Sequence, residues 1–548
     1  MSFKKMHNNL PSSPAAVLNK IQVLLEERDY LNAKKIASKY IKKYPNIQGF
    51  KKALAFCYGA TGDLYGSKEL WMELINIDPF DEEILINLAD IELRLGRVDS
   101  SLGLMKLASE YHPTSIKSWL NMAGAYLLKG EFQNALDVSL QAVNIDPKNA
   151  DGFQNLGSSL FNLGMFQEAR HAFETALLLN PNLQEAKSSL SMVFAKQNEF
   201  LISADILDNL ILNSKKTDRI PIEQLKWDAA LIHLRLGNLS KGFEYYEYGF
   251  HSEVRGHLIR KPHRSFKVDK WTPDMPKNQP VLVWREQGIG DEILFMTCLH
   301  DFIKSGYEPI IETDKRLISI YQRSFPNVVV REALFNNAYP HDSPYEDFGS
   351  HIPMGSLMKA YRNTIVSFPN SAGYLVPDHL LVAKWRDRLK ELRRPNKKII
   401  GLSWKGGISD PLRNSKYTKL IDWSYLLSNP NFEFINFQYG DCLNEIREVE
   451  AILGIKIHRW DDLNLKQDIE DIYGLLANID QLITVSTAVW MFSASIGTPT
   501  TLLLHTNHWT MFDQNFIPFF PNVKCLVADN NESIPELLPQ AVLSFQST

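Results

Sequence analysis

A strand, a glycine-bearing turn and an acidic helix start follow one another after residue 280. We expect the strand at Val281–Trp284, the turn at Glu286–Gly290 and the helix from Asp291. A carboxylate beside glycines at the carboxyl end of a strand could accept a proton from an attacking hydroxyl. The first N–H groups of such a helix lack partners and attract anions. Asp291 is therefore a candidate catalytic residue, and the alternative is that it only caps its helix.

The same turn offers further contacts to a substrate. Gly288 and Gly290 would let a substrate approach the backbone, unless they only satisfy the geometry of the turn. Glu286 and Glu292 are the competing carboxylates. We assign the turn and the acceptor contacts to Glu286, Gln287, Gly288 and Gly290.

Two hydroxyl residues stand where a second anion site could form. Ser486 and Thr487 lie between the predicted strand Gln481–Val485 and the predicted helix Ala488–Ile496. Their hydroxyls and the first free N–H groups of the helix would meet a phosphate there. Simple N-capping is the alternative.

A lysine follows another predicted strand into a glycine-containing loop. The ammonium group of Lys405 could neutralise phosphate charge with help from Arg413, and a solvated loop lysine is the alternative. Gly406 belongs to the same loop. Gln438 and Tyr439 end the next strand, where the base or ribose of a nucleotide could lie.

Other polar residues support no additional chemistry. Asp461, Asp462 and Asp468 lack a metal-ligand spacing, so we expect no metal and no bound cofactor. His505 and His508 follow the last predicted strand of the sheet region and could border a cleft, although lone histidines are usually structural. The sequence has no P-loop, HExxH, GxSxG or complete GxGxxG motif, which disfavours NTPases, zinc proteases, esterases and dinucleotide oxidoreductases.

The N-terminal part carries a repeat of 34 residues. Small residues recur in phase with prolines and glycines, and the period predicts helix–turn–helix units in which glycine closes the first helix. The phase slips past Ser203, so we expect six or seven units over residues 14–250. The prolines are Pro45, Pro79, Pro113, Pro147 and Pro181, and the glycines are Gly62, Gly96, Gly130 and Gly164.

Composition places the chain among ordinary globular proteins. It has 548 residues, a net charge of −4 and four scattered cysteines, and no apolar run approaches the ~20 residues of a membrane span. We therefore predict a cytoplasmic protein with reduced thiols, no membrane span and no nucleic-acid partner.

The repeat unit Asp151–Asn182, DGFQNLGSSLFNLGMFQEARHAFETALLLNPN, resembles the tetratricopeptide repeat. That resemblance implies a groove that binds peptides or proteins, and the alternative is a scaffold or a dimerisation surface.

Four later segments are similar, in order, to glycosyltransferases related to the heptosyltransferases, and above all to those fused behind tetratricopeptide repeats. They are GIGDEILF (288–295), GLSWKGG (401–407), FINFQYGD (434–441) and the stretch from Asp471 to Leu504. The resemblance implies a nucleotide-sugar donor, metal independence and Asp291 as general base. Ser486 stands where that family usually has aspartate and Met491 where it usually has histidine, which puts the specific donor in doubt.

The expected architecture is α + α/β. A disordered tail (1–13) and a repeat superhelix (14–250) precede an extended linker (251–279) docked on the next domain. Its basic cluster is expected to be a solvated face rather than a nucleic-acid patch. A two-lobed GT-B domain then follows, with an acceptor lobe (280–394) and a donor lobe (395–548). A single large doubly wound sheet is the alternative fold.

We therefore expect a glycosyltransferase that moves a sugar from a nucleotide-sugar donor to Ser or Thr of a protein recruited by the repeats. Repeat-fused domains of this type are associated with flagellin glycosylation. The alternatives are a surface-polysaccharide or lipopolysaccharide transferase and an inactive repeat scaffold. Residues 251–548 alone are expected to keep donor binding.

Overall fold

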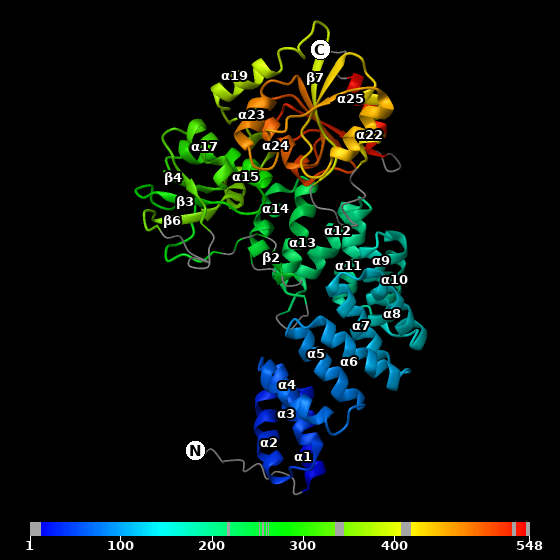
Figure 1. Cartoon of the computed structure of the whole chain (residues 1–548). Coiled ribbons are helices and arrows are strands. Elements are labelled where there is room, and N and C mark those ends of the chain that lie inside the picture. The colour runs from blue at the N-terminus through cyan, green and yellow to red at the C-terminus, as the bar shows by residue number, and fades with distance from the viewer. Residues whose placement is uncertain are drawn as a thin grey trace. The chain divides into compact units, whose positions relative to one another are not determined.

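The computed structural model describes residues 13–215, 220–250, 264–334, 345–406, 418–528 and 533–543, together with 253–254, 257–258, 260 and 262 (Figure 1). The chain divides into two compact units, Met1–Val193 and Phe194–Thr548.

Seven consecutive helical pairs make up the repeats among the described residues. The helices are α1 (Pro14–Glu26), α2 (Tyr30–Lys43), α3 (Gln48–Ala60), α4 (Leu64–Ile75), α5 (Glu82–Arg94), α6 (Val98–Tyr111), α7 (Ile116–Lys129), α8 (Phe132–Ile145), α9 (Ala150–Asn162), α10 (Phe166–Leu179), α11 (Gln184–Lys196), α12 (Phe200–Leu212), α13 (Ile222–Arg235) and α14 (Leu239–Tyr246).

The turn inside each pair contains a residue with left-handed backbone. The predicted glycine turns are confirmed, with φ between 77° and 89° at Gly62, Gly96, Gly130 and Gly164. Asn198 takes the same conformation (φ 63°) one period after Gly164. Asparagine tolerates left-handed backbone better than most residues, so the repeat continues where the glycine is missing. The other two turns have Arg28 (φ 60°) and Gly237 (φ 73°).

The phased small residues lie where the two helices of a pair cross. Ser67 Oγ donates to the carbonyl oxygen of Ala55 at 2.7 Å, and Ser101 Oγ donates to that of Ala89 at 2.6 Å. All four residues are fully buried. A larger side chain at these positions would push the helices apart.

The strands of the C-terminal part form two parallel sheets and a two-stranded antiparallel sheet. The first sheet has the order β5-β4-β3-β6 and the second has the order β12-β11-β10-β7-β8-β9. The alternative of one large sheet is therefore wrong for the described residues. The strands are β1 (Glu253–Val254), β2 (His257–Leu258), β3 (Val281–Trp284), β4 (Pro309–Thr313), β5 (Val329–Glu332), β6 (Ser350–Pro353), β7 (Lys398–Ser403), β8 (Phe432–Asn436), β9 (Ile457–His458), β10 (Gln481–Val485), β11 (Thr500–Leu504) and β12 (Val523–Val527).

Short helices follow most of these strands. The α-helices are α15 (Ile289–Phe295), α16 (Leu299–Lys304), α17 (Ile318–Ser324), α18 (Leu357–Tyr361), α19 (His379–Arg388), α21 (Ser424–Leu427), α22 (Leu443–Leu453), α23 (Ile469–Leu476), α24 (Ala488–Ser495) and α25 (Leu538–Leu543). The 3-10 turns are η1 (Glu247–Phe250), η2 (Met296–Cys298), η3 (Lys315–Leu317), η4 (Met354–Ser356), η5 (Ile365–Ser367), η6 (Leu420–Trp423), η7 (Trp509–Met511) and η8 (Ile534–Leu537).

Helices cover both faces of the six-stranded sheet. Neighbouring residues of β7 point to opposite faces, so Ile399 packs with α23 and α24 while Ile400 packs with α21, α22 and α25. In Figure 1 these two groups of helices lie on opposite sides of β7. Such a sheet leaves its polar groups free for ligands only at the strand ends.

The described part of the connector (251–279) packs on the four-stranded sheet that follows it. Arg260 and Arg264 are buried, with side-chain exposures of 0% and 1%, so the predicted solvated basic face is wrong for both. Arg264 Nη1 donates to Glu312 Oε2 at 2.7 Å. Phe266 packs with Trp284 on the face of the four-stranded sheet opposite α15. Apolar residues of the connector thus cover a face that would otherwise be exposed.

The last helical pairs belong to the second compact unit. Trp227, Phe243 and Tyr246 share one hydrophobic core with Val283 of β3. The boundary at Phe194 therefore precedes the predicted change of domain at residue 250. No helix in the described part of the chain is long and apolar enough to cross a membrane.

Candidate functional site

Three cavities lie along the carboxyl ends of the parallel strands in the second unit. We call them the site cavity (about 340 Å³), the middle cavity (about 220 Å³) and the edge cavity (about 370 Å³). Ile289 and Ala488 line both the site and middle cavities, and Tyr439 lines both the middle and edge cavities. The three cavities therefore neighbour one another along this edge.

The site cavity brings together the two segments that the sequence singled out for anions. It is lined by Gly288–Asp291 from the first sheet and by Ser486–Ala488 from the second, together with Met491, His508 and Trp509. Carboxyl ends of strands from both sheets thus face one space. A ligand there would touch both segments at once.

Asp291 faces this cavity from the first turn of α15. The helix begins two residues earlier than predicted, and Asp291 Oδ2 accepts a hydrogen bond from the backbone N–H of Gly288 at 3.2 Å. Burial and the charge of Glu286 raise the pKa of Asp291 to about 6, although the Gly288 N–H opposes the shift. The carboxylate caps its helix and is also suited to accept a proton near neutral pH.

The competing carboxylates are engaged elsewhere. Glu286 is buried and forms an ion pair with Arg260, and its Oε1 accepts from the N–H of Gly355 at 2.8 Å. Glu292 lies 3.2 Å from Arg285 Nε and accepts a hydrogen bond from Thr313. Neither glutamate lines the three cavities. Asp291 is the only one of the three carboxylates in this segment that does.

The glycines of the turn differ in their role. Gln287, not a glycine, has the left-handed backbone (φ 61°), and its Nε2 donates to Tyr246 Oη at 3.1 Å. Gly288 has an extended backbone (φ −87°) and precedes the helix. A methyl group on Gly290 would lie 2.4 Å from Met491 Sδ. Gly290 therefore lets α15 pack closely on α24 without displacing the side chain of Met491.

The N-terminus of α24 is open on the cavity side. Ser486 is exposed, whereas Thr487 is buried and its hydroxyl lies 3.4 Å from those of Ser403 and Thr484. Thr487 occupies the N-cap position but makes no capping hydrogen bond with its side chain. The side chain of Thr487 thus does not cap the first N–H groups of α24, as the alternative of simple N-capping would require.

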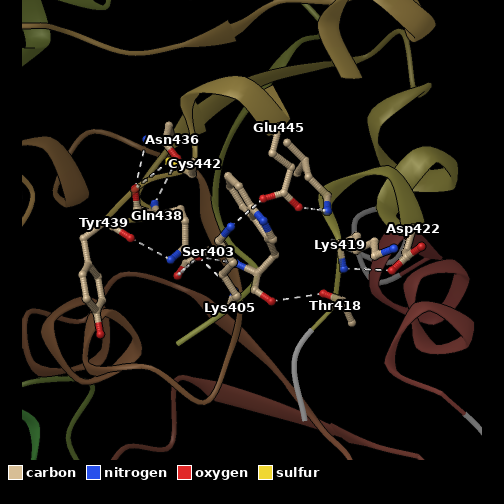
Figure 2. A network of polar contacts seen from close by, with 12 residues as sticks. Ser403, Lys405, Thr418, Lys419, Asp422, Asn436, Gln438, Tyr439, Cys442 and Glu445 are labelled. Carbon is tan, nitrogen blue, oxygen red and sulfur yellow. Dashed lines mark hydrogen bonds and ion pairs between the residues drawn. The ribbon is translucent and has the colours of Figure 1, made fainter. Parts of the chain in front are cut away.

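Gln438 and Lys405 belong to a polar network at the ends of β7 and β8 (Figure 2). Gln438 is buried, and its Oε1 accepts from the N–H groups of Trp404 at 3.0 Å and Lys405 at 2.9 Å. Lys405 Nζ lies 2.7 Å from Glu445 Oε2. Gln438 therefore holds the two strand ends together, and Lys405 is paired with a carboxylate.

The remaining predicted donor contacts have mixed positions. Tyr439 is half-buried and lines the middle and edge cavities. Lys405 and Gly406 line none of the three cavities. Arg413 lies outside the described residues.

Of three further cavity residues, one, His508, was considered from its place in the sequence, and two, Trp509 and Arg316, were missed. His508, which the sequence placed at the possible border of a cleft, lines the site cavity beside Trp509, and its Nδ1 lies 2.8 Å from Thr510 Oγ1. Arg316 lines the middle cavity and donates to the carbonyl oxygen of Lys466 at 2.7 Å. The position of His508 and Trp509 after a predicted buried strand is the signal that could mark both as cavity residues. No such signal marked Arg316.

Within the described ranges, no group of three or more His, Cys, Asp and Glu residues could hold a metal ion. Metal independence stays a prediction.

Comparison with known families identifies the repeats. Residues 116–149 and 150–183 each match the tetratricopeptide repeat family. The protein carries tetratricopeptide repeats. These two repeats are the helical pairs α7–α8 and α9–α10.

Relatives share the repeats and, in one case, most of the chain. Protein FlbA of Caulobacter vibrioides is 25% identical over 512 residues, which cover 92% of this chain and 85% of FlbA. The TPR repeat-containing protein YpiA of Bacillus subtilis is 20% identical over 196 residues, or 33% of this chain and 46% of YpiA. A solved tetratricopeptide repeat protein from Parabacteroides merdae is 13% identical, with a TM-score of 0.37 over 45% of this chain and 96% of its own.

Proposed function

We propose that the protein is a glycosyltransferase with a two-lobed GT-B catalytic part. It would move a sugar from a nucleotide-sugar donor to a hydroxyl group of a protein acceptor, with linkage to Ser or Thr. The observation that carries the proposal is the site cavity, in which Asp291 of one sheet faces the N-terminus of α24 in the other. Flagellin is the candidate acceptor that follows from the sequence resemblance.

The chemistry follows from the two walls of the cavity. Asp291 would remove the proton of the acceptor hydroxyl as that oxygen attacks the anomeric carbon, and the bond from that carbon to the donor phosphate would break. The free N–H groups of α24 would stabilise the negative charge of the departing phosphate. The nucleoside would extend past Tyr439 toward the edge cavity.

The repeats supply the reason for a protein acceptor. Arrays of helical pairs bind polypeptides along extended surfaces. A polysaccharide or lipopolysaccharide acceptor would not need such an array, so this alternative ranks second.

The test is calorimetric binding of UDP, GDP, ADP and CMP to the full chain, with and without EDTA. We expect one nucleotide to bind selectively and without metal, and Tyr439→Ala and Thr487→Ala to weaken its binding by about tenfold each, or about 1.4 kcal/mol. Lys524→Ala, on β12 and outside all three cavities, is the matched control. Failure of every nucleotide to bind would contradict the proposal.

An inactive repeat scaffold is favoured by one observation. The ammonium group of Lys405, expected to meet the donor phosphate, is paired with Glu445. If Lys405 stays paired with Glu445 when a nucleotide is bound, Glu445→Gln will not change the affinity for that nucleotide. In an active transferase that releases Lys405 to the phosphate, Glu445→Gln will raise that affinity.

A further inference from the structure

The last helical pair, α13–α14, contacts both loops that border the site cavity. We call these loops the acid loop (286–291) and the histidine loop (508–513). Gly288–Asp291 of the acid loop and His508–Trp509 of the histidine loop line the cavity. The sequence assigns α13 and α14 to acceptor recruitment, yet their side chains reach the walls of the candidate site.

Arg260 joins the end of α14 to the acid loop. Its Nε donates to Glu286 Oε2 at 2.5 Å, and its Nη2 donates to Glu286 Oε1. Its Nη1 donates to the carbonyl oxygen of Tyr246 at 3.2 Å, and the guanidinium lies 4.4 Å from the centre of the Tyr246 ring and 4.1 Å from that of Phe250. A fully buried arginine bound in two directions fixes the distance between the two segments.

The histidine loop packs against the same helical pair. The rings of Phe243 on α14 and Phe512 are 5.9 Å apart and meet edge to face. A methyl group on Gly237, in the turn between α13 and α14, would lie 3.2 Å from the carbonyl oxygen of Phe512. The loop therefore packs tightly against the turn, and a side chain at Gly237 would require a small shift of the loop.

Both loops hold residues in an unfavourable backbone conformation. Gln287 (φ 61°), Phe512 (φ 50°) and Asp513 (φ 62°) are three of the six non-glycine residues with left-handed backbone among those described. Such conformations persist only where surrounding contacts hold them. Here the contacts include Tyr246 Oη on Gln287 and Phe243 on Phe512.

We propose that the last helical pair is a positioning element of the site cavity, holding the acid loop through Arg260 and Tyr246 and the histidine loop through Phe243. Arg260 is a positioning residue, because it reaches Asp291 only through Glu286. This inference goes beyond acceptor recruitment and holds whatever reaction the cavity supports. Its failure and that of the proposed function are therefore distinguishable.

Hydrogen exchange of the full-length protein, followed by mass spectrometry, tests the proposal. Arg260→Met should speed the exchange of backbone amides in 286–291 by about tenfold or more, because local opening becomes easier. Tyr246→Phe keeps the ring and removes only the bond to Gln287, so it should speed exchange at 287–289. Phe243→Leu should instead speed the exchange of backbone amides in 508–513.

The matched control is Arg264→Met. Arg264 is a second buried arginine among the described residues of the connector, and it pairs with Glu312 of β4 rather than with the acid loop. We expect faster exchange at 309–313 and no change at 286–291. The conservative Arg260→Lys keeps the charge but loses the paired hydrogen bonds. Its exchange rate at 286–291 should therefore lie between those of the wild type and Arg260→Met.

Two outcomes would overturn the proposal. One is unchanged exchange at 286–291 in both Tyr246→Phe and Arg260→Lys. The other is an equal increase at 286–291 in Arg264→Met, which would mean that any loss of connector packing loosens the loop. Tyr246→Phe and Arg260→Lys together decide the matter even if Arg260→Met does not fold.

Discussion

At the scale of single residues, the capping and proton-accepting roles of Asp291 can be separated by experiment. Asp291 Oδ2 accepts a hydrogen bond from the backbone N–H of Gly288, and an asparagine amide oxygen can accept the same hydrogen bond. Asp291→Asn should therefore keep nucleotide affinity and thermal stability but lower the transfer rate by about 100-fold or more. Asp291→Ala should lose the same rate and also about 1 kcal/mol of stability. Wild-type turnover by Asp291→Asn would rule out the general base.

The pH dependence of transfer should report the environment of Asp291. Because its pKa is raised to about 6 and the base must be ionised, the rate should rise with pH through about 6. Glu286 contributes to this shift, so Glu286→Gln should move the rise to lower pH. Arg260→Met leaves the charge of Glu286 uncompensated and should move it to higher pH. A purely structural effect would not shift the two profiles in opposite directions.

A second buried carboxyl predicts how stability depends on pH. Burial raises the pKa of Glu292 to about 7, although Arg285 opposes the shift. The ordinary value is about 4.3, so the folded protein binds more protons than the unfolded chain between these values. The free energy of unfolding should therefore fall as pH rises from about 4.3 to 7, by about 4 kcal/mol from this group. Calorimetric unfolding at pH 5 and 8 should show a smaller difference in Glu292→Gln than in the wild type.

At the scale of elements, the packing of α15 on α24 fixes the width of the site cavity. Gly290→Ala would bring a methyl group against Met491 Sδ and should cost about 1–3 kcal/mol of stability by overpacking. Adding Met491→Ala should recover part of that loss. Gly288→Ala is the control, because a methyl group there meets only Asp291 Oδ2, at 3.3 Å. Thermal unfolding of the wild type and these three variants checks the order, and equal losses at both glycines would contradict it.

The sequence predicted the elements whose pattern is local. Each repeat packs on its neighbours, so a 34-residue period suffices, and the continuous apolar strands β3 and β10 were located within a residue. It missed β6, where Ser350 and Pro353 look unlike a strand, and β12, whose side chains are only partly buried. Both become strands because a neighbouring strand supplies their hydrogen bonds.

The candidate site was predicted in part for the same reason. Glycines and hydroxyls at strand ends marked Gly288–Asp291 and Ser486–Thr487, and the structure brings these segments to one cavity. The partners of these segments could not be predicted, because Arg260 and Glu286 are 26 residues apart in the chain and their ion pair has no sequence period. The pairing of Lys405 with Glu445, 40 residues later, was missed likewise.

At the scale of the whole molecule, the second compact unit decides where the chain can be divided. Trp227, Leu234, Phe243 and Tyr246 of α13–α14 belong to the core that also contains β3, α15 and α24. Removing residues 1–250 would expose this core and leave Arg260 without the contacts to Tyr246. The sequence-based expectation that residues 251–548 keep donor binding therefore conflicts with the packing.

We predict instead that residues 194–548 fold alone and bind the donor nucleotide with an affinity within about twofold of that of the full chain. Residues 251–548 should aggregate or unfold at a much lower temperature. The reason is that burial of each large apolar side chain lost with α13–α14 contributes about 1.5–3 kcal/mol. Residues 194–548 should also lose modification of the protein acceptor, since they lack the repeats of the first unit. Calorimetry and a transfer assay on both fragments check this. A stable fragment 251–548 with full nucleotide affinity would show that α13–α14 are dispensable for the fold. Full acceptor turnover by 194–548 would show that the repeats before residue 194 do not recruit the acceptor.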